Sequence, residues 1–284
     1  MKDLKGKVAV ITGAASGIGK ALAFRCASEG MKIVISDVNE KALIRNQMKL
    51  KKTGTEVIYL VADVSKKEDI EKLARATLEQ FNEVHLLFNN AGVQTLGSSI
   101  IDNTLNDWEW LIGVNLWGMI YSVMTFVPIM LKQDNECHIV NTSSIMGLLP
   151  GGGIYGVTKH GIVSLSESLK FDLEQRKSKI KISVLCPGFV RTFIGTEKQR
   201  PESLKNPSKD SDEGNADILK NRANFKKASL NAKIITPEEA ADFIFNGIRE
   251  NKFYILTPIG PIQESSILKR FKLIEDEIAF IRKF

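Results

Sequence analysis

Short apolar runs alternate with longer amphipathic stretches over the first two thirds of the chain. The first two runs, Val8–Thr12 and Lys32–Ser36, flank a stretch at 19–30 in which apolar residues recur at helical spacing. Further strands are predicted at 56–61, 84–88, 138–141 and 181–185, and further helices at 39–52, 66–81, 107–132 and 155–177. Strands that are apolar throughout are buried on both faces, and the helical stretches are long enough to connect parallel strands. The pattern therefore predicts an α/β fold with a doubly wound parallel sheet.

One polar segment interrupts this alternation. Residues 191–232 are rich in Lys, Asn, Ser, Asp and Glu, contain Pro201 and Pro207, and show little periodicity. Such an insertion can be an ordinary surface loop. Because it follows the end of a predicted strand in a doubly wound sheet, we expect it to be a lid over a substrate.

The C-terminal segment 265–284 has the pattern of an amphipathic helix. Its apolar residues at helical spacing are Ile267, Phe271, Ile274, Ile278 and Ile281. We expect this face to pack on the same chain or on a second copy of it. Attachment to a membrane surface is the alternative.

Composition is that of an ordinary soluble globular protein. The chain has 284 residues, of which 43% are hydrophobic and 25% charged, enough for one large α/β domain or two small ones. No stretch approaches the roughly eighteen uninterrupted apolar residues of a membrane span, and the N-terminus leads directly into a strand pattern instead of a signal peptide. We expect a cytoplasmic protein without membrane association.

Charge and cysteine usage argue against several other classes. The three cysteines are far apart and surrounded by apolar residues, which favours buried thiols, and the histidines have no metal-ligand spacing. The net charge is +6, but lysines are scattered among acidic residues. We therefore expect neither a metal site nor a nucleic-acid partner.

The first chemical signal is the glycine-rich turn Thr12–Gly19, which lies between the first predicted strand and helix. Glycines at 13, 17 and 19 permit a tight turn that brings helix N-terminal amides close to a pyrophosphate. Asp37 follows at the end of the second strand, where a carboxylate can bind the hydroxyls of an adenosine ribose. Together they indicate a dinucleotide-binding site.

Asp37 also favours NAD over NADP. Each unit of charge on a 2′-phosphate about 4 Å from this carboxylate would cost on the order of 4 kcal/mol. The neighbouring Ala14, Ala15, Ser16 and Val38 supply no cation to offset that cost. The alternative role for Asp37 is a cap of the next helix. Asp63, at the end of the third strand, could meet the adenine or cap a helix in the same way.

Tyr155 and Lys159 are four residues apart in a predicted helix and so share one face. A nearby ammonium favours the phenolate, and lowering a phenol pKa from near 10 to about 7 requires roughly 4 kcal/mol. Such a pair is also common on solvated helix surfaces. The preceding dinucleotide turn favours an acid/base role here.

Six sets of residues, in this order, resemble the short-chain dehydrogenase/reductase (SDR) family over about residues 5–195. They are Thr12–Gly19, Asp63-Val64, Asn89–Gly92, Asn115, Tyr155 with Lys159, and Pro187-Gly188. The resemblance implies a single dinucleotide-binding catalytic domain over 1–284, with a Rossmann-type, three-layer α/β/α fold of about seven parallel strands. It also implies a homodimer or homotetramer built through the helices near 107–132 and 155–177.

The family pattern implies a catalytic set of Asn115, Ser144, Tyr155 and Lys159. Tyr155 would exchange the substrate proton, Ser144 would bind the substrate oxygen, and Lys159 would lower the tyrosine pKa and hold the nicotinamide ribose. Asn115 would support a water linked to Lys159. Ser144 is preferred to Ser143 because it lies three residues before Gly147, although the loop 147–154 is shorter than is usual in the family.

The resemblance also assigns residues to the two ligands. The cofactor set is Gly13, Ser16, Gly17, Ile18, Gly19, Asp37, Asp63, Val64, Asn89, Ala91, Gly92, Tyr155, Lys159, Pro187, Gly188, Val190 and Thr192. The substrate set is Ser144, Leu149, Tyr155, Phe189 and Phe193.

The expected activity is hydride transfer between NAD(H) and a secondary alcohol or ketone with a hydrophobic body. This expectation includes an NAD cofactor and a small-molecule substrate. The alternative is a dinucleotide-binding regulatory or scaffold protein with little turnover. Loss of the tyrosine or lysine would favour that alternative, and both are present.

Overall fold

The computed structural model describes residues 1, 3–95, 100–101, 103–192, 194, 199–206 and 233–282. The predicted insertion 191–232 is therefore covered only in its first part. Phe193 lies outside the described residues.

Seven parallel strands form one sheet in the order β3-β2-β1-β4-β5-β6-β7. The strands are β1 (Val8–Thr12), β2 (Lys32–Asp37), β3 (Val57–Val61), β4 (Leu86–Asn89), β5 (Cys137–Thr142), β6 (Ile180–Cys186) and β7 (Tyr254–Leu256). The strand order reverses between β1 and β4, so a crevice is expected there at the carboxyl ends of the strands. This topology confirms the predicted doubly wound, Rossmann-type sheet.

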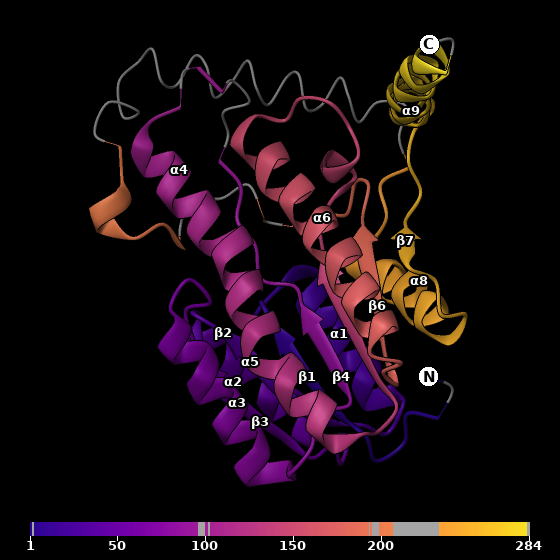
Figure 1. The fold of residues 1–284 in the computed structure, drawn as a ribbon. Helices are drawn as coiled ribbons and strands as arrows, with labels where there is room; N and C mark the ends of the chain where they lie inside the picture. The colour runs from indigo at the N-terminus through magenta and orange to yellow at the C-terminus, as the bar shows by residue number, and fades with distance from the viewer. Residues whose placement is uncertain are drawn as a thin grey trace.

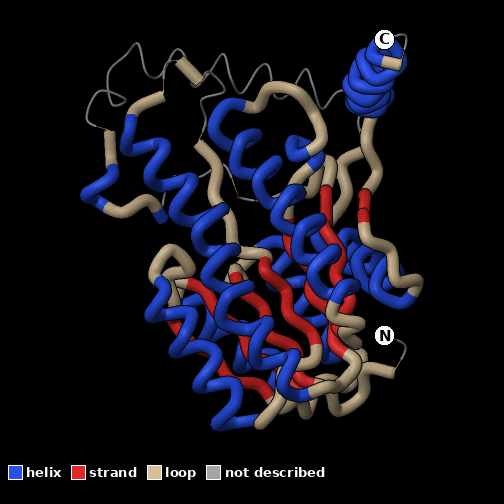
Figure 2. Tube along the Cα trace, in the orientation of Figure 1, coloured by secondary structure: helices blue, strands red, loops and turns tan. Residues whose placement is uncertain are grey.

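Helices cover both faces of the sheet, which gives three layers (Figures 1 and 2). Successive strand residues alternate between the two cores, so that Ile11 and Phe88 face one core while Val10 and Leu87 face the other. The first core is covered by α1 (Gly17–Ser28), α2 (Glu40–Lys51) and α8 (Pro237–Arg249). The second is covered by α3 (Lys67–Phe81), α5 (Gly118–Gln133) and α6 (Gly153–Gln175).

The predicted helix at 107–132 is a continuous run of three pieces. It consists of α4 (Leu105–Leu111), the π-helical turn η1 (Ile112–Trp117) and α5. By length and composition this run could cross a membrane, although a core helix of a soluble protein passes the same test. Here Phe126 and Met130 are buried in the core against the sheet.

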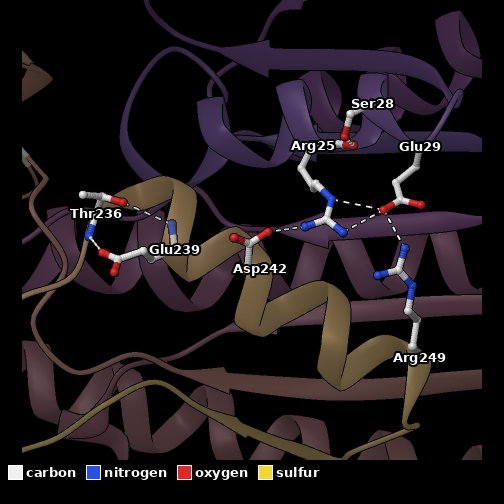
Figure 3. Close-up of polar contacts among 7 residues, drawn as sticks. All are labelled: Arg25, Ser28, Glu29, Thr236, Glu239, Asp242 and Arg249. Carbon is white, nitrogen blue, oxygen red and sulfur yellow. Dashed lines mark hydrogen bonds and ion pairs between the residues drawn. The ribbon is translucent and has the colours of Figure 1, made fainter.

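Helix α8 and strand β7 complete the fold after the insertion. The Thr236 hydroxyl accepts a hydrogen bond from the Glu239 amide while the Glu239 carboxylate accepts one from the Thr236 amide, which caps α8. Ion pairs join α8 to α1 (Figure 3). Glu29 pairs with Arg25 at 2.8 Å and with Arg249 at 2.6 Å, and Arg25 also pairs with Asp242.

Helix α9 (Pro261–Ile281) begins earlier than predicted, and its first turns pack against the body of the chain. Gln263 is buried, and Arg270 donates to the Leu148 carbonyl at 2.9 Å. Beyond Arg270, the apolar residues Phe271, Ile274, Ile278 and Ile281 are exposed. In Figure 1 this helix lies at the upper right, apart from the two helical layers.

Candidate active site

Tyr155 and Lys159 lie on the first turns of α6, at the carboxyl edge of the sheet. Both side chains are buried, with exposed fractions of 8% and 2%, so they do not form a solvated surface pair. The Lys159 Nζ lies 5.4 Å from the centre of the Tyr155 ring. The predicted four-residue spacing therefore brings the two groups together on a buried face.

Strand β5 fixes the position of Lys159. Its Nζ donates to the Thr142 carbonyl at 3.0 Å, and Ser143 Oγ donates to the Lys159 carbonyl at 2.7 Å. Burial lowers the pKa of Lys159 to about 8. At neutral pH the ammonium form still predominates, so the lysine can act as a fixed positive charge.

Ser144 follows β5 and faces the tyrosine. Its Oγ accepts from the Met146 amide at 3.2 Å, which caps the short helix η2 (Ile145–Gly147), and its side chain also hydrogen-bonds Tyr155. The adjacent Ser143 points instead to the α6 backbone. Of the two serines, the structure places Ser144 beside the phenol.

The pKa of Tyr155 differs from the sequence expectation. Burial raises it to about 12, and the hydrogen bond with Ser144 only partly opposes that effect. The phenol lies in an apolar cluster with Val93, Trp110 and Ile154, where a phenolate is poorly solvated. The direction of the pKa shift is therefore opposite to the expected one, because the cost of burying a phenolate exceeds the gain from the Ser144 hydrogen bond.

Asn115 lies in the π-helical turn and holds the loop that follows β4. Its Oδ1 accepts from the Val93 amide at 2.8 Å, and its Nδ2 donates to the Val93 carbonyl at 2.9 Å. Gly92 is the point of close approach, since a Cβ there would lie 3.3 Å from Asn115 Oδ1 and 3.5 Å from Lys159 Nζ. Asn115 is thus next to the lysine, as its predicted role requires.

The glycine-rich turn has the shape needed to receive a pyrophosphate. Gly13 and Gly17 have φ angles of +68° and +53°, which favour glycine. A Cβ on Gly19 would lie 2.2 Å from the Gly13 carbonyl oxygen, so no side chain fits there. The turn leads into α1, with Ser16 at its N-cap and Ile18 in its first turn. These residues can hold a dinucleotide through their backbone amides.

Three polar side chains that were not assigned to either ligand support this turn. Asn46, on α2, donates to the carbonyls of Ala14 and Ala15 at 3.0 and 3.1 Å. The Asn90 side chain donates to the Thr12 carbonyl at 3.1 Å, and the Thr12 hydroxyl accepts from the Ala91 amide at 3.1 Å. The available sequence signal for Asn46 was its place at helical spacing between the apolar Leu43 and Leu50.

Asp37 ends β2 beside the turn. Its carboxylate accepts from the Ala15 amide at 3.1 Å and from the Asn39 amide at 3.0 Å. The cap of α2 is Asn39, which accepts from the Ala42 amide. The alternative role of Asp37 as a helix cap is therefore wrong, and the carboxylate lies at the edge of the dinucleotide turn.

Two further predicted cofactor residues, Asp63 and Asn89, have side chains that already form hydrogen bonds within the protein. Asp63 accepts hydrogen bonds from the amide and hydroxyl of Ser65. The side chain of Asn89 donates to Asn141 at 2.9 Å and accepts from Ser122 of α5 at 2.5 Å. The Asn89 side chain is thus engaged in a buried polar network.

The segment after β6 forms the opposite side of the site. The Pro187 carbonyl accepts from the Ile145 amide at 2.8 Å, and the Gly188 amide donates to Thr257 at 2.9 Å. Val190 pairs with Ile235 in a parallel bridge. Thr192 lies against the glycine-rich turn, since a Cβ added to Gly17 would be 3.1 Å from the Thr192 methyl group. These contacts place the segment after β6 beside the glycine-rich turn.

The predicted substrate residues fall in different places. Phe189 is half-buried beside Val190, and Leu149 is buried in a cluster beneath η2 that is separate from the cluster around Tyr155. Leu204, which the sequence did not indicate, packs against the Tyr155 cluster. Among the described residues, no group of His, Cys, Asp and Glu could hold a metal ion.

Comparison with known proteins supports a common architecture. The model of the family described as short chain dehydrogenase matches residues 7–203. A CLA biosynthesis dehydrogenase/reductase from Lactiplantibacillus plantarum is 36% identical over 260 residues, which cover 90% of each chain. A C alpha-dehydrogenase from a Sphingobium strain is 32% identical and covers 98% of this chain and 88% of its own.

Solved structures extend the similarity to the whole fold. A short chain dehydrogenase/reductase from Burkholderia phymatum, determined in complex with NAD, has a TM-score of 0.85 and 41% identity, over 99% of this chain and 96% of that one. A putative short-chain dehydrogenase from Novosphingobium aromaticivorans has a TM-score of 0.76 and 28% identity, over 98% of this chain and 88% of its own.

Proposed function

This chain belongs to the short-chain dehydrogenase family, and we propose that it transfers a hydride between NAD(H) and a secondary alcohol or ketone with a hydrophobic body. The observation that carries this proposal is the buried Tyr155, hydrogen-bonded to Ser144 and accompanied by Lys159 at the carboxyl edge of the sheet. The apolar residues around the phenol favour a hydrophobic substrate.

The names of two relatives support the substrate class. A protein from Streptomyces exfoliatus that is 35% identical over 192 residues is a 1-deoxy-11-beta-hydroxypentalenate dehydrogenase, a name that states a hydroxylated substrate. A structure named levodione reductase, 26% identical with a TM-score of 0.73, is a reductase. These names cover both directions of reaction.

The roles of the residues follow from their positions. Bound NAD(H) would accept or supply the hydride. Tyr155 gives its proton to the carbonyl oxygen in reduction and, as the phenolate, takes the hydroxyl proton in oxidation, while Ser144 donates to the substrate oxygen as its charge changes. Lys159 places a positive charge beside the phenol and has N–H groups beyond the one bonded to Thr142 for the nicotinamide ribose.

Asp37 supports the choice of NAD. Its carboxylate lies at the first turn, where it can bind the ribose hydroxyls and repel a 2′-phosphate. The described residues next to it, Ala15, Ser36 and Val38, carry no positive charge. The similar structure from Burkholderia phymatum, with NAD bound, agrees with this choice.

We expect the protein to act as a homodimer or homotetramer through α5 and α6. Met124 on α5 and Phe171 on α6 are 61% and 62% exposed, so both helices present large apolar side chains at the surface. Trp117 at the end of η1 and Val157 on α6 add further exposed apolar surface. A second copy would cover these side chains.

The proposal is tested with Tyr155→Phe. NADH binding is measured by fluorescence on mixing, and turnover is measured with a panel of secondary alcohols. The variant should bind NADH like the wild type while losing roughly a hundredfold to ten-thousandfold in rate, the usual contribution of a general acid/base. Equal activity of the two proteins, or NADH binding by the wild type without any turnover, would refute the enzymatic role.

A further inference from the structure

Arg200 and Asp107 form a buried ion pair that the catalytic roles above do not use. Arg200 Nη1 lies 2.7 Å from Asp107 Oδ1, and the exposed fractions of the two side chains are 1% and 0%. Arg200 follows β6, whereas Asp107 lies at the start of α4, so the pair joins segments far apart in the chain. Removing one partner of such a pair leaves a charge buried without compensation.

The Asp107 carboxylate connects α4 to both ends of the stretch 200–206. Oδ2 accepts from the Thr104 amide at 3.0 Å, as part of the capping box of α4. Oδ1 accepts from Arg200 and also from Asn206 Nδ2 at 3.0 Å. The short helix η4 (Glu202–Leu204) is thereby held beside α4 (Figure 1).

Arg200 in turn fixes Leu204. Its Nε donates to the Leu204 carbonyl at 2.7 Å, and its guanidinium lies 5.2 Å from the centre of the Trp110 ring. The Leu204 amide donates to the Pro201 carbonyl at 3.0 Å. The side chain of Leu204 packs against the apolar cluster that contains Trp110 and Tyr155.

We infer that Leu204 is a wall of the substrate site that limits the size of the hydrophobic body, and that the Arg200–Asp107 pair is the device that positions it. This inference rests on the proposed function, since it concerns the substrate beside Tyr155. Arg200 binds the Leu204 carbonyl, and Asp107 binds both Arg200 and Asn206. Leu204 therefore cannot move away easily, and the volume of its side chain limits the size of the ligand. Arg200 and Asp107 are positioning residues, because they act through Leu204.

The test of Leu204 uses alcohols of increasing size: isopropanol, cyclohexanol and cyclododecanol. Leu204→Ala should raise kcat/KM for cyclododecanol roughly tenfold and Leu204→Phe should lower it by a similar factor, within the range by which pocket contacts discriminate substrates. Isopropanol should be affected little by either change. The matched control is Leu105→Ala on α4, because Leu105 is 78% exposed and should show no dependence on size. Equal effects of the two Leu204 variants on all three alcohols would overturn the inference.

The test of the ion pair uses Arg200→Met, Arg200→Lys and Asp107→Asn. Arg200→Met should speed hydrogen exchange of residues 199–206 without affecting β4 and β5, and should change KM for cyclododecanol more than kcat. Arg200→Lys keeps the positive charge, so its effects on exchange and on KM should be smaller than those of Arg200→Met. NADH affinity should stay unchanged in all three. Faster exchange at 199–206 with an unaltered KM would show that this stretch does not border the substrate.

Ligand binding separates this inference from the proposed function. Cyclohexanone and cyclododecanone are titrated into the protein–NADH complex of the wild type and of the Leu204 variants. Ketone binding that follows the size of residue 204, without turnover by the wild type, contradicts the proposed function and supports the Leu204 wall. Turnover by the wild type, with no effect of residue 204 on ketone binding, contradicts the wall alone.

Discussion

At the scale of single residues, Lys159 combines complete burial with a position beside Tyr155. Burial lowers the pKa of Lys159 to about 8, whereas the same side chain in the unfolded chain titrates near 10.5. Below pH 8 both states carry the proton, and the folded state bears the cost of a buried ammonium. Between pH 8 and 10.5 the unfolded state binds more protons, so stability rises with pH in that window.

Lys159→Met tests both consequences. Activity should fall roughly a hundredfold or more, and the pH profile of the remaining activity should move to higher pH, because the phenolate loses a neighbouring positive charge. The wild type should gain stability relative to the variant between pH 8 and 10.5, by roughly 3 kcal/mol for a shift of this size. Urea unfolding at several pH values measures this difference. Parallel pH dependence of the two proteins would contradict the lysine assignment.

Asp37→Ala tests the cofactor preference at the neighbouring site. Removing the carboxylate eliminates its repulsion of a 2′-phosphate and its bonds to the ribose hydroxyls. NADH affinity should fall, NADPH affinity should rise, and their ratio should move towards one. Fluorescence titrations give both affinities. A wild type that binds NADPH more tightly than NADH would show that the Asp37 argument is wrong.

Residues with local signatures were predictable from the sequence, whereas residues that act from a distance were not. Tyr155 with Lys159, and Asp37 after the glycine turn, are recognisable by spacing alone. Asn46 and Arg200 act on segments that meet them only after folding. The pKa of Tyr155 could not be predicted either, because it depends on the surrounding apolar side chains.

At the scale of elements, the strongly periodic strands and helices were predicted, whereas β7 and α8, near the C-terminus, were not. Strand β7 has only three residues, too few for a periodic pattern. Helix α8 was missed although Thr236, Pro237 and Glu239 form a recognisable helix start. The π-helical turn at Asn115 has no clear sequence signature, because it depends on the contacts of Asn115 with Val93.

The junction of α1 and α8 should weaken in acid. Although partial burial opposes the effect, hydrogen bonds from Arg25 and Arg249 hold the pKa of Glu29 below its usual value. Its contribution to stability is present above the unfolded pKa of about 4.5 and is lost as the pH falls through the folded pKa. Glu29→Gln should cost up to about 1 kcal/mol at pH 7 and little below the folded pKa. Equal losses at both pH values, measured by urea unfolding, would contradict this role.

At the scale of the whole molecule, the alternating pattern predicted the sheet and its two helical layers. The expected oligomer is inferred instead from exposed apolar side chains. Met124 and Phe171 each present a large apolar surface on α5 and α6. Substituting both with Asp should dissociate the expected oligomer, because burial of a charge at an apolar contact is unfavourable. Light scattering after size-exclusion chromatography gives the mass.

Met48→Asp on α2 serves as the control for that experiment, because Met48 is 57% exposed but lies away from α5 and α6. It should leave the mass unchanged. A monomeric wild type, or an oligomer that survives both substitutions, would show that α5 and α6 do not form the interface.

We propose that this protein moves a hydride between an alcohol and NAD with Tyr155 as the acid/base. The most direct measurement uses secondary alcohols that carry deuterium at the carbinol carbon, with mass spectrometry of the cofactor. The wild type should transfer the label to the reduced nicotinamide, and Tyr155→Phe should transfer it far more slowly despite normal cofactor binding. Cofactor bound by the wild type without transfer of label, or label transferred equally by the variant, would contradict the account.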